Sequence, residues 1–334
     1  MKRAGFLIEK IADMENLLLA FYKAQKGKSH KTDVIRYREN LDANLRGLQQ
    51  QILTGKIDVG KYNLFNIYDP KQRVVCAAAF DERVLHHAIM NVCAPYFERQ
   101  FIHTTYANRT GKGTFKALEE AHRAMGKYRY VAKLDVRKYF NNIDHSVLKD
   151  LLRHIFKDRH LLDLLSAVIE SYEVEKGRGL PIGNLTSQYF ANYYLSGLDH
   201  YAKEELRAAV YVRYMDDILL FGNDKRELGI KVEQICQYSQ SKLHLEMKPP
   251  QIQQTSENTT FLGYCLHGRC ISMSSRSKRR FERKYRVAEQ NLTNGTWTAE
   301  QYQAHVTPLF AFTRHAYTKR YRQQVIRKVT VVGL

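Results

Sequence analysis

The chain has 334 residues, of which 44% are hydrophobic, and this length allows one large unit or about two to three smaller units with a core. No apolar run is long enough to span a bilayer. The N-terminal stretch mixes charged with apolar residues at helical spacing, so we expect neither a membrane anchor nor a signal peptide. The five cysteines are an odd number and form no CxxC pair, which argues against disulfides. The thirteen histidines do not show the spacing of zinc ligands, which argues against a zinc site. These features predict a reduced, cytoplasmic protein.

The net charge of +19 is large for this length and predicts a polyphosphate partner, with solubility as the alternative explanation. Residues 274–334 hold thirteen Lys and Arg against three Glu and no Asp. Within them, RSKRRFERKYR places Phe281 and Tyr285 four residues apart, on one helical face. We therefore favour a nucleic-acid-binding helix with a packed aromatic face over a solvated basic face. Its predicted contacts are Arg279, Arg280, Arg283 and Lys284.

The first part of the chain predicts helices followed by a hairpin. Residues 1–60 are expected to form helices. Residues 61–80, KYNLFNIYDPKQRVVCAAAF, predict two apolar strands joined by a turn at DPKQ. From residue 81 to residue 101 apolar side chains recur at helical spacing, and we expect this helix to stop near Pro95.

Residues 108–125, NRTGKGTFKALEEAHRAM, predict a glycine-containing loop that enters a helix. The loop lacks the full GxxxxGK[ST] pattern of a phosphate loop, and we expect only that Arg109 and Lys112 contact nucleic acid. The next segment, YRYVAKLDVRKYFNNIDH at 128–145, predicts a strand that carries Asp135 among apolar residues. An aspartate in such a strand is disfavoured unless it is paired or binds a metal.

The second part of the chain mixes helices with short strands. A helical region is expected up to about residue 172, and the glycine- and proline-containing loop GRGLPIG then opens into an aromatic-rich helix. After a hairpin come a helix at 224–245, a strand and turn TTFLGYCL at 259–266, and basic helices over the last 60 residues. This order predicts an α+β core with helical appendages.

The hairpin YVRYMDDILLFG at 211–222 is predicted as strand, tight turn and strand, with Asp216 and Asp217 at its tip. Adjacent carboxylates repel each other, and a solvated polar turn explains them as well as a metal site does. Once Asp135 is also considered, we favour the metal site over the polar turn. Two strands that each carry an otherwise disfavoured carboxylate can share a pair of divalent ions. Polymerases and nucleases both use two divalent metal ions, so the acids alone do not distinguish a polymerase from a nuclease.

Several motifs resemble those of reverse transcriptases, and they occur in the family's order from about residue 60 to residue 270. YMDD resembles the catalytic hairpin, KLDVRKYF the first catalytic strand, and GLPIGNLTSQYFAN the loop-helix motif. DPKQRVV and FDERVLHHAI resemble the fingers segments of bacterial members, and FLGY resembles the primer-grip turn. The resemblance implies an α+β right-hand polymerase with fingers, a palm of antiparallel sheet plus helices, and a helical thumb. The implied division is N-terminal helices and fingers with part of the palm at 1–130, the catalytic palm at 131–270, and a basic thumb at 271–334.

The resemblance also implies a role for individual residues. Asp135, Asp216 and Asp217 would be catalytic and, with Val136, would hold two Mg²⁺ ions, which Mn²⁺ can replace in vitro. Phe140 would stack beneath the deoxyribose and exclude a ribose 2′-hydroxyl, with a core aromatic as the alternative role. Template RNA and cDNA would contact Tyr214 and Met215 as well as the basic residues named above. The incoming dNTP would be bound by Lys71, Arg73, Arg83, Phe140, Ile182, Gly183, Gln188 and Lys248.

Two departures from the common pattern narrow the subfamily. Ile182 stands where most relatives have Gln, and Ser187-Gln188 stands where most have Ser-Pro. The combination PIGNLTSQ resembles reverse transcriptases of bacterial and phage diversity-generating retroelements, which copy a template RNA with frequent errors at adenines for mutagenic retrohoming. This resemblance implies a small basic multimeric accessory protein as a partner, and no membrane. The alternatives are a retron, phage-defence or intron-type reverse transcriptase, and a nucleic-acid binding protein whose polymerase site has decayed.

Overall fold

The computed structural model describes residues 3–68 and 73–331. The chain divides into two compact units and passes between them several times. The predicted division into three parts at residues 130 and 270 stays a prediction. Unit 1 consists of Met1–Arg109, Asp135–Leu206 and Glu233–Lys248, and unit 2 of Thr110–Leu134, Arg207–Val232 and Pro249–Leu334.

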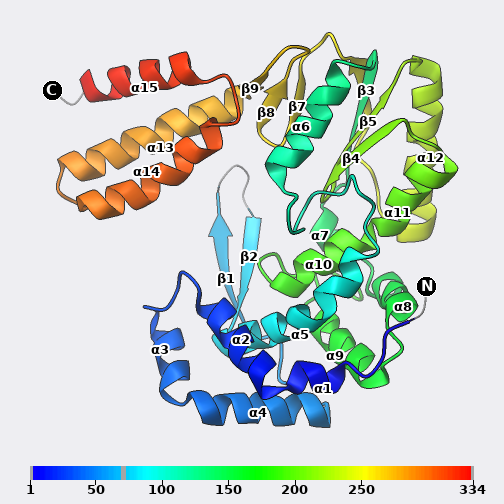
Figure 1. Cartoon of the computed structure of the whole chain (residues 1–334), viewed down its shortest axis with the longest axis vertical. Coiled ribbons are helices and arrows are strands. Elements are labelled where there is room, and N and C mark those ends of the chain that lie inside the picture. The colour runs from blue at the N-terminus through cyan, green and yellow to red at the C-terminus, as the bar shows by residue number, and fades with distance from the viewer. Residues whose placement is uncertain (1–2, 69–72, 332–334) are drawn as a thin grey trace. The chain divides into compact units, whose positions relative to one another are not determined.

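Unit 1 is mainly helical and contains the predicted hairpin (Figure 1). Its N-terminal helices are α1 (Ile8–Ala12), α2 (Met14–Gln25), α3 (Thr32–Glu39) and α4 (Leu41–Thr54). The hairpin pairs β1 (Tyr62–Ile67) with β2 (Arg73–Ala78) in antiparallel register, and α5 (Phe80–Glu98) follows it. The later helices are α7 (Tyr139–Asn142), α8 (His145–Ile155), α9 (Arg159–Glu170), α10 (Leu185–Tyr194), α11 (Ser196–His200) and the π-helix η1 (Tyr201–Glu205). Helix α5 is central to this unit, because α2 and α10 both pack against it.

The expectation that the helix after the hairpin stops near Pro95 is wrong, because α5 continues to Glu98. A proline inside a helix removes one backbone N–H donor and weakens the helix there. Here the turn after Pro95 is buried: Phe97 is fully covered, and its ring lies 5.8 Å from that of Phe156 and 5.4 Å from that of Tyr193, centroid to centroid. Aromatic packing therefore outweighs the lost hydrogen bond.

Unit 2 contains a four-stranded sheet in the order β4-β5-β3-β6. Its strands are β3 (Tyr130–Asp135), β4 (Val210–Tyr214), β5 (Asp217–Gly222) and β6 (Gln251–Gln254), and the boundary between the units falls within β3, before Asp135. The helix α6 (Thr114–Met125) packs on β4 and β5 through small and apolar side chains such as Ala117, Leu118 and Ala121. The helix α12 (Lys225–Leu243) follows β5 and belongs partly to each unit.

The C-terminal part of unit 2 begins with a small antiparallel sheet of β7 (Thr259–Phe261), β8 (Tyr264–Leu266) and β9 (Ile271–Met273). The helices α13 (Ser275–Thr293), α14 (Ala299–Thr313) and α15 (Lys319–Val331) follow and lie side by side in Figure 1. The predicted aromatic face of α13 is confirmed: Phe281 and Tyr285 are buried with ring centroids 6.1 Å apart, and Phe310 of α14 packs edge-on against both. No helix within 3–68 or 73–331 is both long and apolar enough to cross a membrane.

Candidate active site

The paired acids lie where the hairpin prediction puts them, at the turn between β4 and β5. Tyr214 is opposite Asp217 in the register, which leaves Met215 and Asp216 as a two-residue turn. Met215 has φ +53°, a left-handed conformation that few non-glycine residues adopt. Its carbonyl accepts a hydrogen bond, at 3.1 Å, from the guanidinium of Arg213, whose side chain is fully buried. A buried cation thus supports the turn that presents the acids.

Asp135 is the last residue of β3, the strand that neighbours β5 in the sheet order. Its Oδ2 accepts a hydrogen bond from Lys248 Nζ at 2.5 Å. Its Oδ1 is buried and has no hydrogen-bond partner among the described residues. A buried carboxylate oxygen without a donor suits a hard divalent cation, which fits the predicted metal role. Within the described ranges no group of three or more His, Cys, Asp or Glu is arranged to hold a metal, so the number of ions stays a prediction.

The segment after β3 is paired with the chain around Lys248. Lys248 N–H donates to the Asp135 carbonyl at 2.8 Å, and Arg137 N–H donates to the Glu246 carbonyl at 2.9 Å. Val136, predicted as a metal neighbour, lies between these bonds; its side chain is buried. Lys248 was predicted to bind the dNTP, and that role stays a prediction; its ammonium group contacts Asp135.

The two aromatic residues after β3 have different surroundings. Tyr139 is buried, and its hydroxyl donates to the Ala191 carbonyl. Phe140 is only half-buried, and its carbonyl accepts the N–H of Leu180 at 2.8 Å. Tyr139 therefore has the surroundings of a core aromatic residue. The core role that was the alternative for Phe140 fits that residue less well. The sugar-sensing role of Phe140 stays a prediction.

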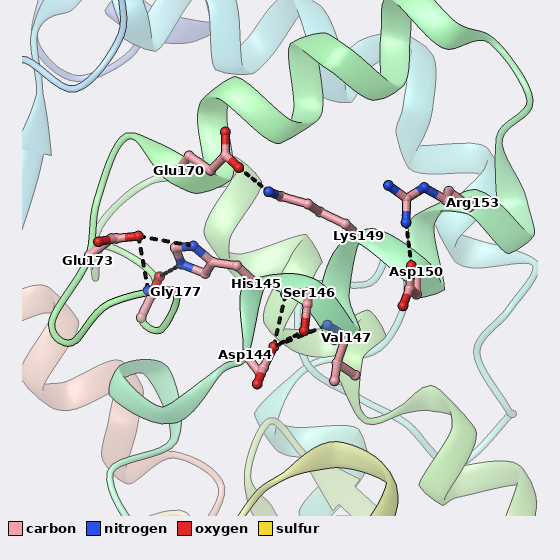
Figure 2. Close-up of polar contacts among 11 residues, drawn as sticks. Asp144, His145, Ser146, Val147, Lys149, Asp150, Arg153, Glu170, Glu173 and Gly177 are labelled. Carbon is pink, nitrogen blue, oxygen red and sulfur yellow. Dashed lines mark hydrogen bonds and ion pairs between the residues drawn. The ribbon is translucent and has the colours of Figure 1, made fainter.

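Polar contacts fix the start of α8 beside the loop that leads to the PIGN motif (Figure 2). The Asp144 carboxylate accepts hydrogen bonds from the backbone N–H groups of Ser146 and Val147 and caps the helix. Burial alone would raise the pKa of Asp144, but these bonds and those from the Ser146 hydroxyl and His244 outweigh it and lower the pKa to about 2. His145 N–H donates to the Gly177 carbonyl at 2.9 Å.

The PIGN loop lies against the second strand of the hairpin. The Ile182 carbonyl accepts the N–H of Cys76 at 2.8 Å. Gly183 has φ +130°, and a Cβ atom there would lie 2.9 Å from the Cys76 carbonyl oxygen. Only glycine fits this close approach without a shift of the backbone.

A pocket of about 280 Å³ lies beside this loop, and its lining includes three of the predicted dNTP-binding residues. Arg83 is half-buried, and burial lowers its pKa. Burial and the Arg83 charge lower the pKa of Lys28, and burial with the neighbouring cations lowers that of His87 to about 4. The charges of Lys28 and Arg83 repel each other here, and two cations at one pocket form a site suited to an anion. The predicted residues that the pocket brings together are Arg83, Gly183 and Gln188.

Lys28 was missed by sequence reasoning, and the basic run KGKSHK that contains it was the available signal. Arg73 is exposed at the start of β2, and Lys71 lies outside the described residues. The role of either residue in dNTP binding stays a prediction.

A buried polar chain connects the hairpin, α5 and α10. Glu82 is 3% exposed, and its Oε2 accepts the N–H groups of Gly60 and Lys61. Its Oε1 lies 3.4 Å from Nε2 of His86, and Nδ1 of that histidine lies 3.0 Å from the Thr186 hydroxyl. His86 thus connects α5 to α10 through the Thr186 hydroxyl.

The predicted nucleic-acid contacts differ in accessibility. Arg109 has a structural role: its guanidinium pairs with Glu98 at 2.7 Å and donates to the carbonyls of Ile102 and Thr105, and only 7% of its side chain is exposed. This internal pairing argues against the expected contact with nucleic acid. Lys112 is half-buried in the loop before α6. The remaining predicted contacts on α13, which we call the α13 basic face, are exposed or half-buried: Arg279, Arg280, Arg283 and Lys284.

Residues 66–266, which contain the acid hairpin, β3 and the PIGN loop, match the family described as reverse transcriptase (RNA-dependent DNA polymerase). The chain belongs to the reverse transcriptase family. This membership confirms the predicted α+β class of a right-hand polymerase. The roles of individual residues stay predictions.

Proteins similar to this reverse transcriptase in sequence are distant relatives with low identity. Group II intron-encoded protein LtrA of Lactococcus lactis subsp. cremoris is 26% identical over 137 residues, which cover 39% of this chain and 23% of that protein. Protein YkfC of Escherichia coli (strain K12) is 21% identical over 271 residues, covering 66% and 71% respectively. Among solved structures, apo telomerase from Candida tropicalis aligns with a TM-score of 0.48 and 13% identity, covering 64% of this chain and 55% of that one. The chain thus spans less than a quarter of the length of the intron-encoded protein.

Proposed function

We propose that this reverse transcriptase is an RNA-directed DNA polymerase that copies a template RNA into cDNA from dNTPs. The observation that carries the proposal is the placement of acids within the family region: Asp216 and Asp217 at a supported tight turn, and Asp135 with a buried, unpartnered oxygen at the end of a neighbouring strand. The family match favours a polymerase over the nuclease that the acids alone would also allow.

In the proposed reaction Asp135 and Asp216 would hold two divalent cations, Mg²⁺ by preference, with support from Asp217 and Val136. Bound there, divalent cations would lower the pKa of the primer 3′-hydroxyl and offset the charge of the transferring phosphate. Phe140 would restrict the sugar to deoxyribose. The cationic pocket beside the PIGN loop offers Arg83 for an anionic group of the dNTP, because fixed cations offset phosphate charge without reorganisation.

Substitution of the acids tests the proposal. We expect Asp216→Ala and Asp135→Ala to abolish primer extension on an RNA template with Mg²⁺, with RNA affinity within about twofold of the wild type, because affinity depends mainly on phosphate contacts. Asp163→Ala, at an exposed carboxylate of α9, is the matched control and should extend normally. Extension by either acid variant above a few per cent of wild type contradicts the assignment of the metal ligands.

We further propose that the enzyme belongs to a diversity-generating retroelement, acts in the cytoplasm, and works with a small basic multimeric accessory protein. The sequence PIGNLTSQ, with Ile182 and Gln188, supports this subtype. An intron-type reverse transcriptase is the second candidate, because proteins named as intron-encoded are among the relatives.

One experiment distinguishes the two subtypes. The enzyme is purified with and without the products of neighbouring genes, and the cDNA that it makes is sequenced. Dependence on a small basic partner and errors concentrated at template adenines support the retroelement subtype. Independent synthesis with evenly distributed errors supports the intron type.

A further inference from the structure

We infer that Lys248 is a built-in counter-ion of Asp135, which occupies Oδ2 of this carboxylate when no divalent cation is bound and must leave it when one binds. The inference rests on the proposed function in one respect, namely that Asp135 is a metal ligand. The contact is direct, with 2.5 Å between Lys248 Nζ and Asp135 Oδ2.

The backbone fixes this pair. Lys248 N–H donates to the Asp135 carbonyl and Arg137 N–H donates to the Glu246 carbonyl, so residues 135–137 run antiparallel to residues 246–248. Cross-strand neighbours in such a ladder project to the same side. Asp135 therefore faces Lys248, while Arg137 faces Glu246 in a second ion pair at 3.1 Å.

The two oxygens of Asp135 are in different situations. Oδ2 is neutralised by the ammonium group, and Oδ1 is buried and receives no hydrogen bond from the part of the chain that the structure describes. A divalent cation that binds through both oxygens must displace the ammonium, whereas one that binds through Oδ1 alone is repelled by it. In either case Lys248 lowers the affinity of the metal-free protein for the cation.

The ion pair is also weak enough to open. The side chains of Lys248 and Asp135 are 41% and 29% exposed, so water can solvate both charges once they separate. Partly exposed ion pairs contribute little net free energy, which corresponds to a factor of up to about five in an equilibrium constant. Lys248 is therefore a replaceable substitute for the metal charge, and it keeps the carboxylate paired until a cation arrives.

Binding of Mn²⁺ to the full chain, followed by electron paramagnetic resonance without nucleic acid or dNTP, tests the inference. We expect Lys248→Met to bind Mn²⁺ about two- to fivefold more tightly than wild type, because the competing charge is gone. Lys248→Arg keeps the charge and should stay close to wild type. Lys149→Met is the matched control, because Lys149 also pairs with a carboxylate, but with that of Glu170 (Figure 2).

The double variant Asp135→Asn/Lys248→Met completes the cycle, and we expect the effect of the lysine substitution to vanish in it. Wild-type or weaker Mn²⁺ affinity in Lys248→Met overturns the inference. If thermal unfolding shows that this variant is unfolded, Lys248→Gln is measured under the same criterion. Unchanged Mn²⁺ affinity in Asp135→Asn alone would instead overturn the metal assignment of the proposed function, so the two failures are distinguishable.

Discussion

Replacement of Gly183 by alanine should disturb both stability and dNTP binding. The backbone at Gly183 has φ +130°, a region that side chains rarely enter, at a cost on the order of 1–3 kcal/mol. The new Cβ would also lie 2.9 Å from the Cys76 carbonyl oxygen and 3.2 Å from Val75 Cγ1. Because a backbone oxygen cannot rotate away, the loop must move off β2.

The movement would weaken the hydrogen bond between the Ile182 carbonyl and Cys76 N–H, which is worth about 0.5–1.5 kcal/mol. Together with the conformational cost, we expect Gly183→Ala to lower the free energy of unfolding by about 2–4 kcal/mol. The KM for dNTP should rise as well, because Gly183 lines the cationic pocket.

Urea unfolding and primer extension at varied dNTP concentration measure the two effects. Gly55→Ala is the matched control: Gly55 also has a positive φ, +71°, but a Cβ there meets no atom within 4 Å. It should therefore show only the conformational cost, with an unchanged KM. Equal stability losses in the two variants, with the same KM, would refute the close-contact argument.

Three further results are expected. The lowered pKa of Asp144 means that its ionised form stabilises the folded state above about pH 4 and that this stabilisation is lost as the pH falls toward 2; Asp144→Asn should therefore lower the Tm at pH 7, and a difference that stays constant down to pH 3 would contradict this. Neutralisation of the α13 basic face should reduce the slope of log K against log salt by roughly 0.7–0.9 for each lost phosphate contact, and an unchanged slope would mean that this face does not meet the template. Ile182→Gln should lower misincorporation opposite template adenine more than opposite other bases, because an unpaired buried amide costs about 1–3 kcal/mol; equal adenine error rates in sequenced cDNA would leave Ile182 as packing.

Local patterns in the sequence predicted the elements well. The acid hairpin, the β1–β2 pair and the buried seam of Phe281 and Tyr285 are all encoded by neighbours within a few residues of one another. The end of α5 could not be predicted, because the packing that carries the helix past Pro95 comes from rings such as Phe156, far along the chain.

The positions of the acidic site residues were predictable from the sequence, but the partners of the lysine and arginine side chains were less so. A lysine or arginine can reach several partners, and only the fold selects one. Lys248 is 113 residues from Asp135 in the sequence, and no spacing rule connects them. The same holds for Arg109, whose guanidinium is used inside the protein, and for Lys28, which the fold brings to Arg83. Arg213 was recognisable only as a cation on an apolar strand.

The buried carboxylate of Glu82 limits how the β1–β2 hairpin can be exchanged between relatives. In a chimera that replaces residues 61–78, the backbone N–H groups just before β1 must still point toward Glu82. Only then are the two hydrogen bonds to its carboxylate kept. Loss of that fit leaves the Glu82 carboxylate in the protein interior without its two backbone donors, beside His86, whose other nitrogen is already engaged with Thr186 of α10. The β1–β2 hairpin therefore cannot be transferred alone, and a functional chimera must include α5 as well.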